Sequence, residues 1–561
     1  MTVDIAPGPL TVPYTRALDR LEQAGFAEAL WQKRLDVWTS DAATQQKIAT
    51  RLGWLDAIEF VTPHLPRLRA LAADVKAAGF TDILLLGMGG SSLAPEVLRQ
   101  VIGVAAGHPR FRVLDSVDPD AVRAAMAQAP STLFILASKS GSTIEPNVMA
   151  AEASRRVQLA GHAWGSRVIA ITDPDTQLHQ RAAAEGFRDV FVNPPDIGGR
   201  FSALSFFGLV PAALMGADLD ALLQSARAMD AACRAPVAGD NPGAALGALM
   251  AAGALTGRDK MTLLFPERLQ PLGLWVEQLV AESTGKQGKG VVPVAGEGPD
   301  APLGADRIIV AVSLDDEAPD PSVLARAREA GVPIATLRMN GVAALGGEFL
   351  RWEIATAAAG FLLSINPFDE PNVAQAKDAT RALLDVYKAQ GSLPTPEPAA
   401  AIQGVRLALS AAAEDQLSGA GAEAFLRLVK PGDYLALLAY VPSDEAAWAG
   451  VLHQLRGDAG VAAACSTMFG FGPRYLHSTG QLHKGGADNG VFIVITAEPA
   501  DDLAIPGEPF SFGILEMAQA LGDFQSLGKA GRRALHIHLP RRDPSLLTAI
   551  GALLIEGRAQ S

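Results

Sequence analysis

The sequence predicts an α/β protein with two doubly wound parallel sheets, followed by a C-terminal α/β segment. From about residue 80 onward, short continuous apolar runs alternate with stretches of helical periodicity. Apolar strands separated by helices are typical of parallel sheets that helices cover on both faces. The chain has 561 residues, of which 49% are hydrophobic and 19% charged. It is therefore long and apolar enough for two to four domains.

The first 60 residues are expected to form a helical segment, because apolar side chains such as Leu21, Phe26 and Leu30 recur at helical spacing. A first five-stranded domain is expected over residues 61–235. Its predicted strands are Asp82–Gly87, Phe111–Val117, Thr132–Ala137, Arg167–Thr172 and Asp189–Val192.

A second α/β domain is expected over residues 236–393 and a third over residues 394–561. The segment Gly391–Pro398 separates them and is predicted to be a linker, since it is rich in glycine, serine and proline. Predicted strands of the second domain are Lys260–Phe265, Arg307–Leu314 and Pro333–Met339, with a long helix at Gly347–Leu363. Those of the third are Asp433–Val441, Val461–Met468, Val491–Thr496 and Ala534–Leu539.

Composition excludes several classes of partner. The net charge of −13 disfavours nucleic acid and anionic membranes, although a small phosphate needs only local hydrogen-bond donors. Two cysteines, Cys233 and Cys465, cannot build a disulfide framework. No apolar run is long enough to span a membrane, and Met1–Leu10 does not read as a signal peptide. A cytoplasmic location is therefore expected.

A phosphate-binding loop is predicted at residues 138–143. The apolar strand Thr132–Ala137 runs into a loop rich in hydroxyl groups, and a helix begins at Ile144. The free N–H groups and dipole of a helix N-terminus favour an anion, and strand ends are where such sheets bind ligands. The alternative is an ordinary capping box, with Ser142 as N-cap and Glu145 three residues later.

A second glycine-rich turn follows the strand that ends at Leu86. Gly87-Met88-Gly89-Gly90-Ser91-Ser92 comes close to a dinucleotide-binding fingerprint, which makes a dehydrogenase an alternative. The next predicted strand even passes through Asp115, an acidic residue of the kind that binds ribose. However, Ser92 stands where the fingerprint requires its third glycine.

Together these motifs resemble the sugar isomerase (SIS) domain, and specifically the phosphoglucose isomerase family. Gly87–Ser91 and Ser138–Thr143 occur in family order, and the resemblance covers about residues 80–390. Four further segments agree with the family: Asp196–Ser202 with its Gly-Gly-Arg, Gln278–Lys286, Gly360–Leu363, and Asn366–Lys377. Several separate motifs in order are more specific than any one of them.

The resemblance implies a catalytic role for four residues. Glu282 would be the base that moves a proton between C1 and C2, and Arg200 would stabilise the enediolate. Lys377 and His477 would act in ring opening. Taken alone, Glu282 and Lys377 would be interpreted as exposed helix residues, and His477 could be a turn residue. For Arg200, the stabilising role and an ordinary place in a turn are about equally favoured. The implied substrate-binding residues are Gly89, Gly90, Ser91, Ser138, Lys139, Ser140, Ser142, Thr143 and Gln278.

The C-terminal third departs from ordinary members of the family, in which a catalytic histidine lies between the glutamate and lysine motifs. No histidine occurs between Glu282 and Lys377, and Leu476–Gln481, Leu-His-Ser-Thr-Gly-Gln, lies beyond the linker instead. This arrangement resembles the isomerase half of bifunctional transaldolase–phosphoglucose isomerase proteins. We therefore expect residues 400–561 to complete the site. His477 is preferred over His483, six residues on, because it matches the motif.

The implied reaction is the interconversion of glucose 6-phosphate and fructose 6-phosphate. Enediol chemistry needs no metal or other cofactor, so none is expected. His536 and His538 are interpreted as ordinary strand residues, since no further metal-ligating side chains lie nearby in the sequence. The family implies a homodimer, whereas a third domain that supplies His477 would permit a monomer. Alternatives are an isomerase that also accepts mannose 6-phosphate and a regulatory protein that only binds sugar phosphates.

Overall fold

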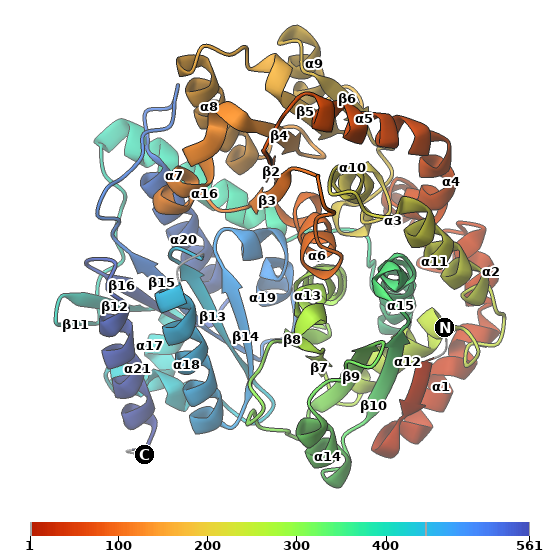
Figure 1. Ribbon diagram of the computed structural model, residues 1–561. Helices are drawn as coiled ribbons and strands as arrows, with labels where there is room; N and C mark the ends of the chain where they lie inside the picture. Colours follow the sequence, from red (N-terminus) through yellow and green to blue (C-terminus); the bar gives the residue numbers. More distant parts are fainter. Residues whose placement is uncertain (1–2, 444–445, 560–561) are drawn as a thin grey trace.

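The computed structural model describes residues 3–443 and 446–559, and it confirms the predicted fold class (Figure 1). The first unit is built on a five-stranded parallel sheet in the order β3-β2-β4-β5-β6. Its strands are β2 (Asp82–Leu86), β3 (Arg110–Leu114), β4 (Thr132–Ala137), β5 (Val168–Thr172) and β6 (Asp189–Val192). Its helices are α5 (Leu65–Ala77), α6 (Leu93–Val101), α7 (Pro119–Ala125), α8 (Ile144–Leu159), α9 (Gln177–Ala184) and α10 (Phe206–Leu214).

The second unit has a sheet in the order β1-β10-β9-β7-β8, parallel except for β1. Its strands are β1 (Val3–Ala6), β7 (Lys260–Leu264), β8 (Val292–Ala295), β9 (Arg307–Leu314) and β10 (Ile334–Met339). The helices around it are α1 (Thr11–Gln23), α11 (Leu219–Ala232), α12 (Pro242–Leu255), α13 (Gln270–Thr284), α14 (Pro321–Glu329) and α15 (Leu345–Leu363). Three short helices, α2 (Phe26–Trp31), α3 (Ala42–Ala49) and α4 (Ala57–Val61), connect α1 to the first unit.

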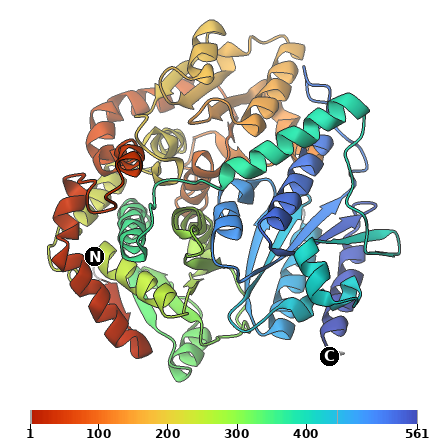
Figure 2. The same cartoon turned by 180° about the vertical axis from the view of Figure 1, so that it is seen from behind.

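The third unit contains a six-stranded sheet in the order β11-β12-β16-β15-β13-β14. Its strands are β11 (Ala400–Ile402), β12 (Val405–Leu409), β13 (Tyr434–Tyr440), β14 (Ser466–Phe471), β15 (Gly490–Ala497) and β16 (Arg533–Leu539). Its helices are α17 (Ala411–Leu417), α18 (Ala446–Ala463), α19 (Gly480–Gly485), α20 (Phe512–Lys529) and α21 (Pro544–Ala559). Helix α16 (Val373–Gln390) packs alongside α20 (Figure 2).

Two expectations from the sequence need correction. The segment 1–60 is not wholly helical, because Val3–Ala6 pairs antiparallel with β10 as an edge strand. The predicted strand Val461–Met468 is also wrong in its first half: α18 continues to Ala463 and β14 begins only at Ser466. Apolar periodicity does not resolve a strand of only four residues, nor the boundary between a helix end and the strand that follows it.

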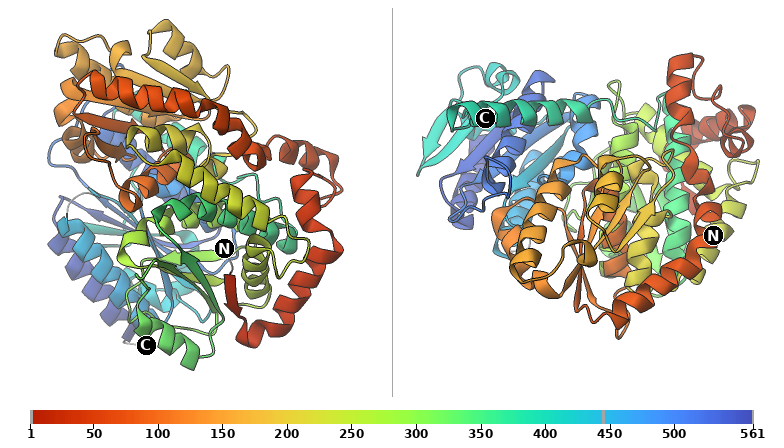
Figure 3. Two further views of the ribbon diagram at one scale, coloured as in Figure 1. Left: turned by 45° about the vertical axis from the view of Figure 1, so that its right-hand side comes forward. Right: turned by 90° about the horizontal axis from the view of Figure 1, so that it is seen from above.

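The three units meet around shared cores rather than in a row (Figures 1 and 3). One apolar cluster joins Ala281 and Val294 of the second unit to Leu438, Leu482 and other residues of the third. Another joins the first sheet to α16 and α20. The bonds of Arg474 to Asp115, after β3, and of His477 to Glu145, after β4, show that the carboxyl ends of these two strands face the third unit. No helix within the described ranges combines the length and apolar character that crossing a membrane demands.

Candidate active site

Glu282 lies near the end of α13, where it is 9% exposed. Its Oε1 is 3.3 Å from Nη1 of Arg200, and its Oε2 accepts a hydrogen bond of 3.3 Å from Nε2 of Gln278, one turn earlier on the same face. Burial raises the pKa of Glu282 to about 7, although the Arg200 charge opposes this shift. A carboxylate with such a pKa can accept and return protons near neutral pH.

Arg200 is buried in a short 3₁₀ turn, Gly199–Phe201, and forms an ion pair with Glu282. Its guanidinium also donates four hydrogen bonds, to Oγ of Ser283 at 2.7 Å, Oε2 of Glu370 at 3.0 Å, and the carbonyl oxygens of Pro367 at 2.9 Å and Asp369 at 3.0 Å. Burial alone would lower the pKa of Arg200, but the carboxylates of Glu282 and Glu370 outweigh it, so the group stays charged. Arg200 thus joins α13 to the segment before α16.

His477 comes from the third unit and reaches the first, because it lies in the 3₁₀ turn Arg474–His477 that follows β14. Its Nε2 is 2.8 Å from Oε1 of Glu145, at the start of α8, and its carbonyl oxygen accepts a bond of 2.7 Å from Nε2 of Gln278. Gln519 of α20 donates to the same Oε1 at 2.6 Å. Burial would raise the pKa of Glu145, but His477 outweighs it and the net shift is downward.

Two glycines allow this close approach. Gly89 has φ +53°, and a Cβ there would lie 2.5 Å from the carbonyl oxygen of His477. A Cβ on Gly90 would lie 2.1 Å from the carbonyl oxygen of Gly199. The predicted glycine turn is therefore where the backbones of all three motifs meet. Ser91 closes this turn, with its N–H donating to Met88 O at 3.1 Å.

The hydroxyl loop divides into an inward and an outward part. Ser138 is buried, and its Oγ accepts from Gly141 N–H at 3.1 Å and lies 3.2 Å from Oγ1 of Thr143. Lys139 points away from the loop, to Asp173 and to Pro195 O at 2.8 Å. Ser140 accepts from the N–H of Ser142 at 3.3 Å. Of the loop, Ser142 and Thr143 line a cavity.

That cavity has a volume of about 400 Å³ and opens beside His477. Glu145, Lys377 and Gln519 line it together with the two hydroxyl residues. Lys377 is exposed on α16, and its charge is among those that lower the pKa of Glu145. The capping-box interpretation is wrong: Thr143 is the N-cap, and Glu145 turns to His477 instead.

The structure brings together Glu282, Arg200, Gln278 and His477 by direct contacts, and Lys377, Ser142 and Thr143 around the adjoining cavity. Three other loop residues, Ser138, Lys139 and Ser140, do not line this cavity. Glu282 itself does not line the cavity. Gln278 connects it to the cavity, because its Nε2 donates both to Glu282 and to the carbonyl oxygen of His477, which lines the cavity.

His483 lies away from these groups. It is buried in the core, 1% exposed, with its Nδ1 3.2 Å from the hydroxyl of Tyr434. Burial lowers the pKa of His483 well below its usual value, which leaves a neutral ring.

Asp115 does not offer a free carboxylate for a ribose. Arg474 binds it through two bonds of 2.7 and 2.8 Å, and Ser92 Oγ is 3.3 Å away. This bidentate pair instead fixes the turn that carries His477 to the first sheet.

Sequence reasoning missed Glu145, Gln519 and Arg474. Glu145 was noticed only as a capping residue, although its place at the end of a phosphate-type loop was a signal. Gln519 and Arg474 lie in the third unit, and nothing local in the sequence marks them. Within the described residues, no group of three or more possible ligands could hold a metal ion.

Part of the chain is similar to proteins of a known family. Residues 68–293 match the family model of phosphoglucose isomerase. Glucose-6-phosphate isomerase of Prochlorococcus marinus (strain MIT 9313) is 31% identical over 290 residues, which cover 50% of this chain and 52% of the relative. The same enzyme of Synechococcus sp. (strain JA-2-3B'a(2-13)) is 37% identical over 240 residues, 41% of this chain and 45% of the relative. The chain thus spans about half the length of the curated relatives it matches.

Two solved structures share the fold. A hypothetical protein from Thermus thermophilus aligns with a TM-score of 0.57 at 27% identity, over 68% of this chain and 99% of that chain. A glucose-6-phosphate isomerase from Chlamydia trachomatis aligns with a TM-score of 0.53 at 17% identity, over 68% and 86%. At that identity the second likeness supports the fold alone.

Proposed function

We propose, on the premise that residues 68–293 belong to the phosphoglucose isomerase family, that the whole chain interconverts glucose 6-phosphate and fructose 6-phosphate. The observation that carries this proposal is the position of Glu282. It is a buried carboxylate with a pKa near 7, held between the charge of Arg200 and the amide of Gln278. A protein that only bound sugar phosphates would need no such base.

The proposed reaction has three steps. The phosphate binds at the hydroxyls of Ser142 and Thr143 and the N-terminus of the 16-residue helix α8. His477 and Lys377 then move a proton to or from the ring oxygen, with Glu145 holding the imidazole in place. Glu282 next takes the proton from C2 and returns it to C1.

Arg200 contributes through its charge, because four hydrogen bonds to Ser283, Glu370, Pro367 and Asp369 already hold its guanidinium in place. A fixed positive charge in a buried site stabilises the negative charge that develops on the enediolate. It also keeps part of the Glu282 population ionised.

The test is a coupled assay with fructose 6-phosphate and a chelator, comparing the wild type with Glu282→Gln. The variant keeps the shape of the side chain but removes the base, so kcat should fall by about 100-fold or more. Glu277→Gln is the matched control: Glu277 is also buried on α13, its Oε1 accepts from Ala295 N–H at 2.9 Å, and burial raises its pKa to about 8. It should stay near wild-type activity.

An inactive wild type, or a Glu282→Gln variant as fast as the wild type, would contradict the proposal. Binding of the sugar phosphate without turnover would favour the regulatory alternative. Mannose 6-phosphate in the same assay decides the breadth of specificity. The cytoplasmic location, the homodimer and the resemblance to the bifunctional proteins stay predictions.

A further inference from the structure

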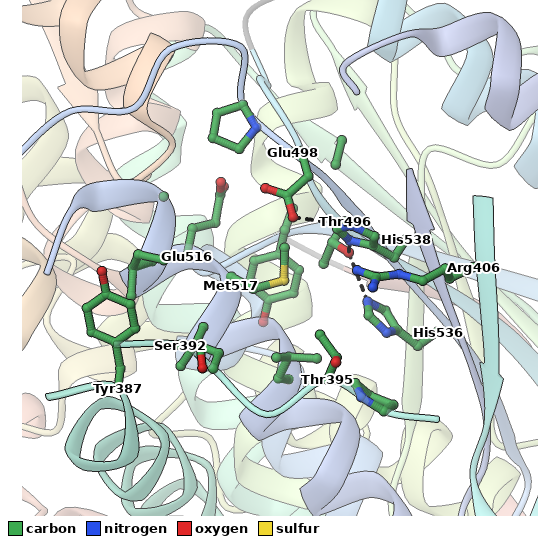
Figure 4. A pocket seen from close by; sticks show the side chains of 18 of the residues that line it. Tyr387, Ser392, Thr395, Arg406, Thr496, Glu498, Glu516, Met517, His536 and His538 are labelled. Atoms are coloured by element: carbon green, nitrogen blue, oxygen red, sulfur yellow. Dashed lines mark hydrogen bonds and ion pairs between the residues drawn. The ribbon is translucent and has the colours of Figure 1, made fainter. Parts of the chain in front are cut away.

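The third unit holds a second cavity that the proposed reaction does not use (Figure 4). Its volume is about 320 Å³, and it lies between β12, β15 and β16, helix α20 and the linker after α16. It shares no lining residue with the cavity beside His477. Two features of the sequence that found no role in catalysis, the linker and the His536-Ile537-His538 motif, both line it.

Strand register places the polar side chains of this cavity on one face of the sheet. Arg406 of β12 pairs with His538 of β16, and His538 pairs with Thr496 of β15. His536 and His538 point the same way because alternate residues of a strand share a face. Figure 4 shows Arg406, Thr496 and both histidines gathered at one end of the cavity.

A chain of hydrogen bonds sets the state of the histidines. Glu498 Oε1 is 3.3 Å from Nε2 of His538, whose Nδ1 is 2.9 Å from Oγ1 of Thr496. The same Oγ1 is 2.9 Å from Nε2 of His536. If Glu498 accepts from His538, then Thr496 donates to His538 and accepts from His536. The Nδ1 of His536 is then left as a hydrogen-bond acceptor.

His536 stays neutral, because burial lowers its pKa to about 3. Both rings are already bonded to Thr496, which argues against a metal. The cation among the arginines and lysines that line the cavity is Arg406, which is half-buried. In the part of the chain that the structure describes, the guanidinium of Arg406 makes no hydrogen bond or ion pair, although its charge helps to lower the pKa of the nearby Glu498. A half-buried guanidinium without such a partner, aimed into a cavity, indicates an anionic ligand.

The surroundings favour a single negative charge. Glu498, Asp502 and Glu516 also line the cavity, and burial raises the pKa of Glu516 well above its usual value. A phosphate dianion would therefore meet two carboxylates, a third carboxyl group and one cation. A carboxylate carries one charge and matches the fork of a guanidinium. Figure 4 shows Tyr387 and Met517 on the opposite side, beside the carboxyl group of Glu516. Leu393 and Ile514 add further apolar lining. Such a wall accommodates an organic ring or chain.

We infer that this cavity is a second small-molecule site, which takes a small organic monocarboxylate by pairing its carboxylate with Arg406 and its apolar part with the wall of α20 and the linker. The inference is independent of the proposed function. It rests on the unpartnered guanidinium and the ordered histidine pair.

The test measures binding of benzoate to the full chain by calorimetry, beside benzamide, its neutral isostere, and phenyl phosphate, its dianionic counterpart. Benzoate should bind about 10-fold or more tightly than either, since one charge-assisted pair is at stake. Arg406→Gln should weaken benzoate binding by about 10-fold or more. Arg16→Gln, at an exposed arginine of α1, is the matched control and should bind benzoate as the wild type does.

Two further variants test whether benzoate binds in this cavity and not in the one beside His477. Ser392→Trp fills the mouth of the cavity from the exposed linker without touching the core, so it should also abolish binding. Lys377→Gln, in the other cavity, should leave binding unchanged. Benzoate that binds no better than benzamide or phenyl phosphate, that binds Arg406→Gln equally well, or that requires Lys377 would overturn the inference.

Discussion

Two buried carboxylates of the candidate site have pKa values shifted in opposite directions by their neighbours. Glu282 is buried beside Arg200, and burial together with the charge of Glu370 raises its pKa to about 7. Glu145 is equally buried, but His477 and Lys377 favour its charged form and its pKa falls. In the proposed reaction these opposite shifts suit different roles: Glu282 would exchange protons, and Glu145 would orient an imidazole.

Glu370→Gln should move the acidic limb of the pH profile of kcat/KM to lower pH. The base must be ionised, so kcat/KM should fall about tenfold per pH unit below about 7. The charge of Glu370 raises the pKa of Glu282, and the variant removes it, so the acidic limb should move to lower pH. The measurement is kcat/KM from pH 5 to 9. Glu329→Gln, at an exposed glutamate, should leave the limb in place, whereas a limb shifted upward in Glu370→Gln would contradict the assignment.

At the scale of elements, the site depends on three turns that touch through their backbones. The turn at Gly89 meets the turn at His477, and the neighbouring Gly90 meets Gly199. Arg474 holds the turn of His477 to Asp115 at the end of β3. A side chain at one contact should therefore disturb the position of the catalytic groups as a whole.

Gly89→Ala tests this directly, with Gly25→Ala as control. Both glycines have positive φ, +53° and +58°, so both variants strain the backbone by roughly 1–2 kcal/mol. A Cβ at Gly25 meets nothing within 4 Å, whereas one at Gly89 presses on His477. We expect kcat to fall by about 10-fold or more in Gly89→Ala only. Equal losses of activity in both variants would show that backbone strain, and not the contact, is responsible.

At the scale of the whole molecule, the third unit is part of the body that forms the candidate site. It supplies His477 and Gln519 to the first unit, and its apolar residues share a core with Ala281 and Val294 of the second. A site assembled within one chain does not need a histidine from a second subunit.

Truncation at Pro394 should therefore lower kcat by about 100-fold or more, because it deletes His477 and exposes the shared core to solvent. The full-length variant His477→Gln separates these effects: its amide can still donate to Glu145 but cannot carry a proton. We expect a comparable loss of kcat in the coupled assay, with thermal unfolding close to that of the wild type. A truncated chain with full activity would disprove a role for residues 400–561.

Much of the fold followed from local patterns. All five predicted strands of the first sheet are present, because continuous apolar runs between helices leave a parallel sheet as the stable arrangement. Strand β1 was missed because four residues carry too little periodicity, and its pairing with β10 is decided by a partner roughly 330 residues away. The bonds of Gln519 to Glu145 and of Arg474 to Asp115 were missed for a similar reason, because each joins residues far apart in the sequence.

The sequence by itself determined the chemistry that this protein can offer: the hydroxyl loop, the glycine turn, and the glutamate, arginine, lysine and histidine in their motifs. Residue types and short spacings specify these, since each depends on a strand, a turn or a helix that forms locally. Only the tertiary structure decided that His477 rather than His483 meets Glu145, and that Lys139 turns away from the loop. Those choices rest on contacts between units far apart in the chain, which burial and close packing select and no local pattern records.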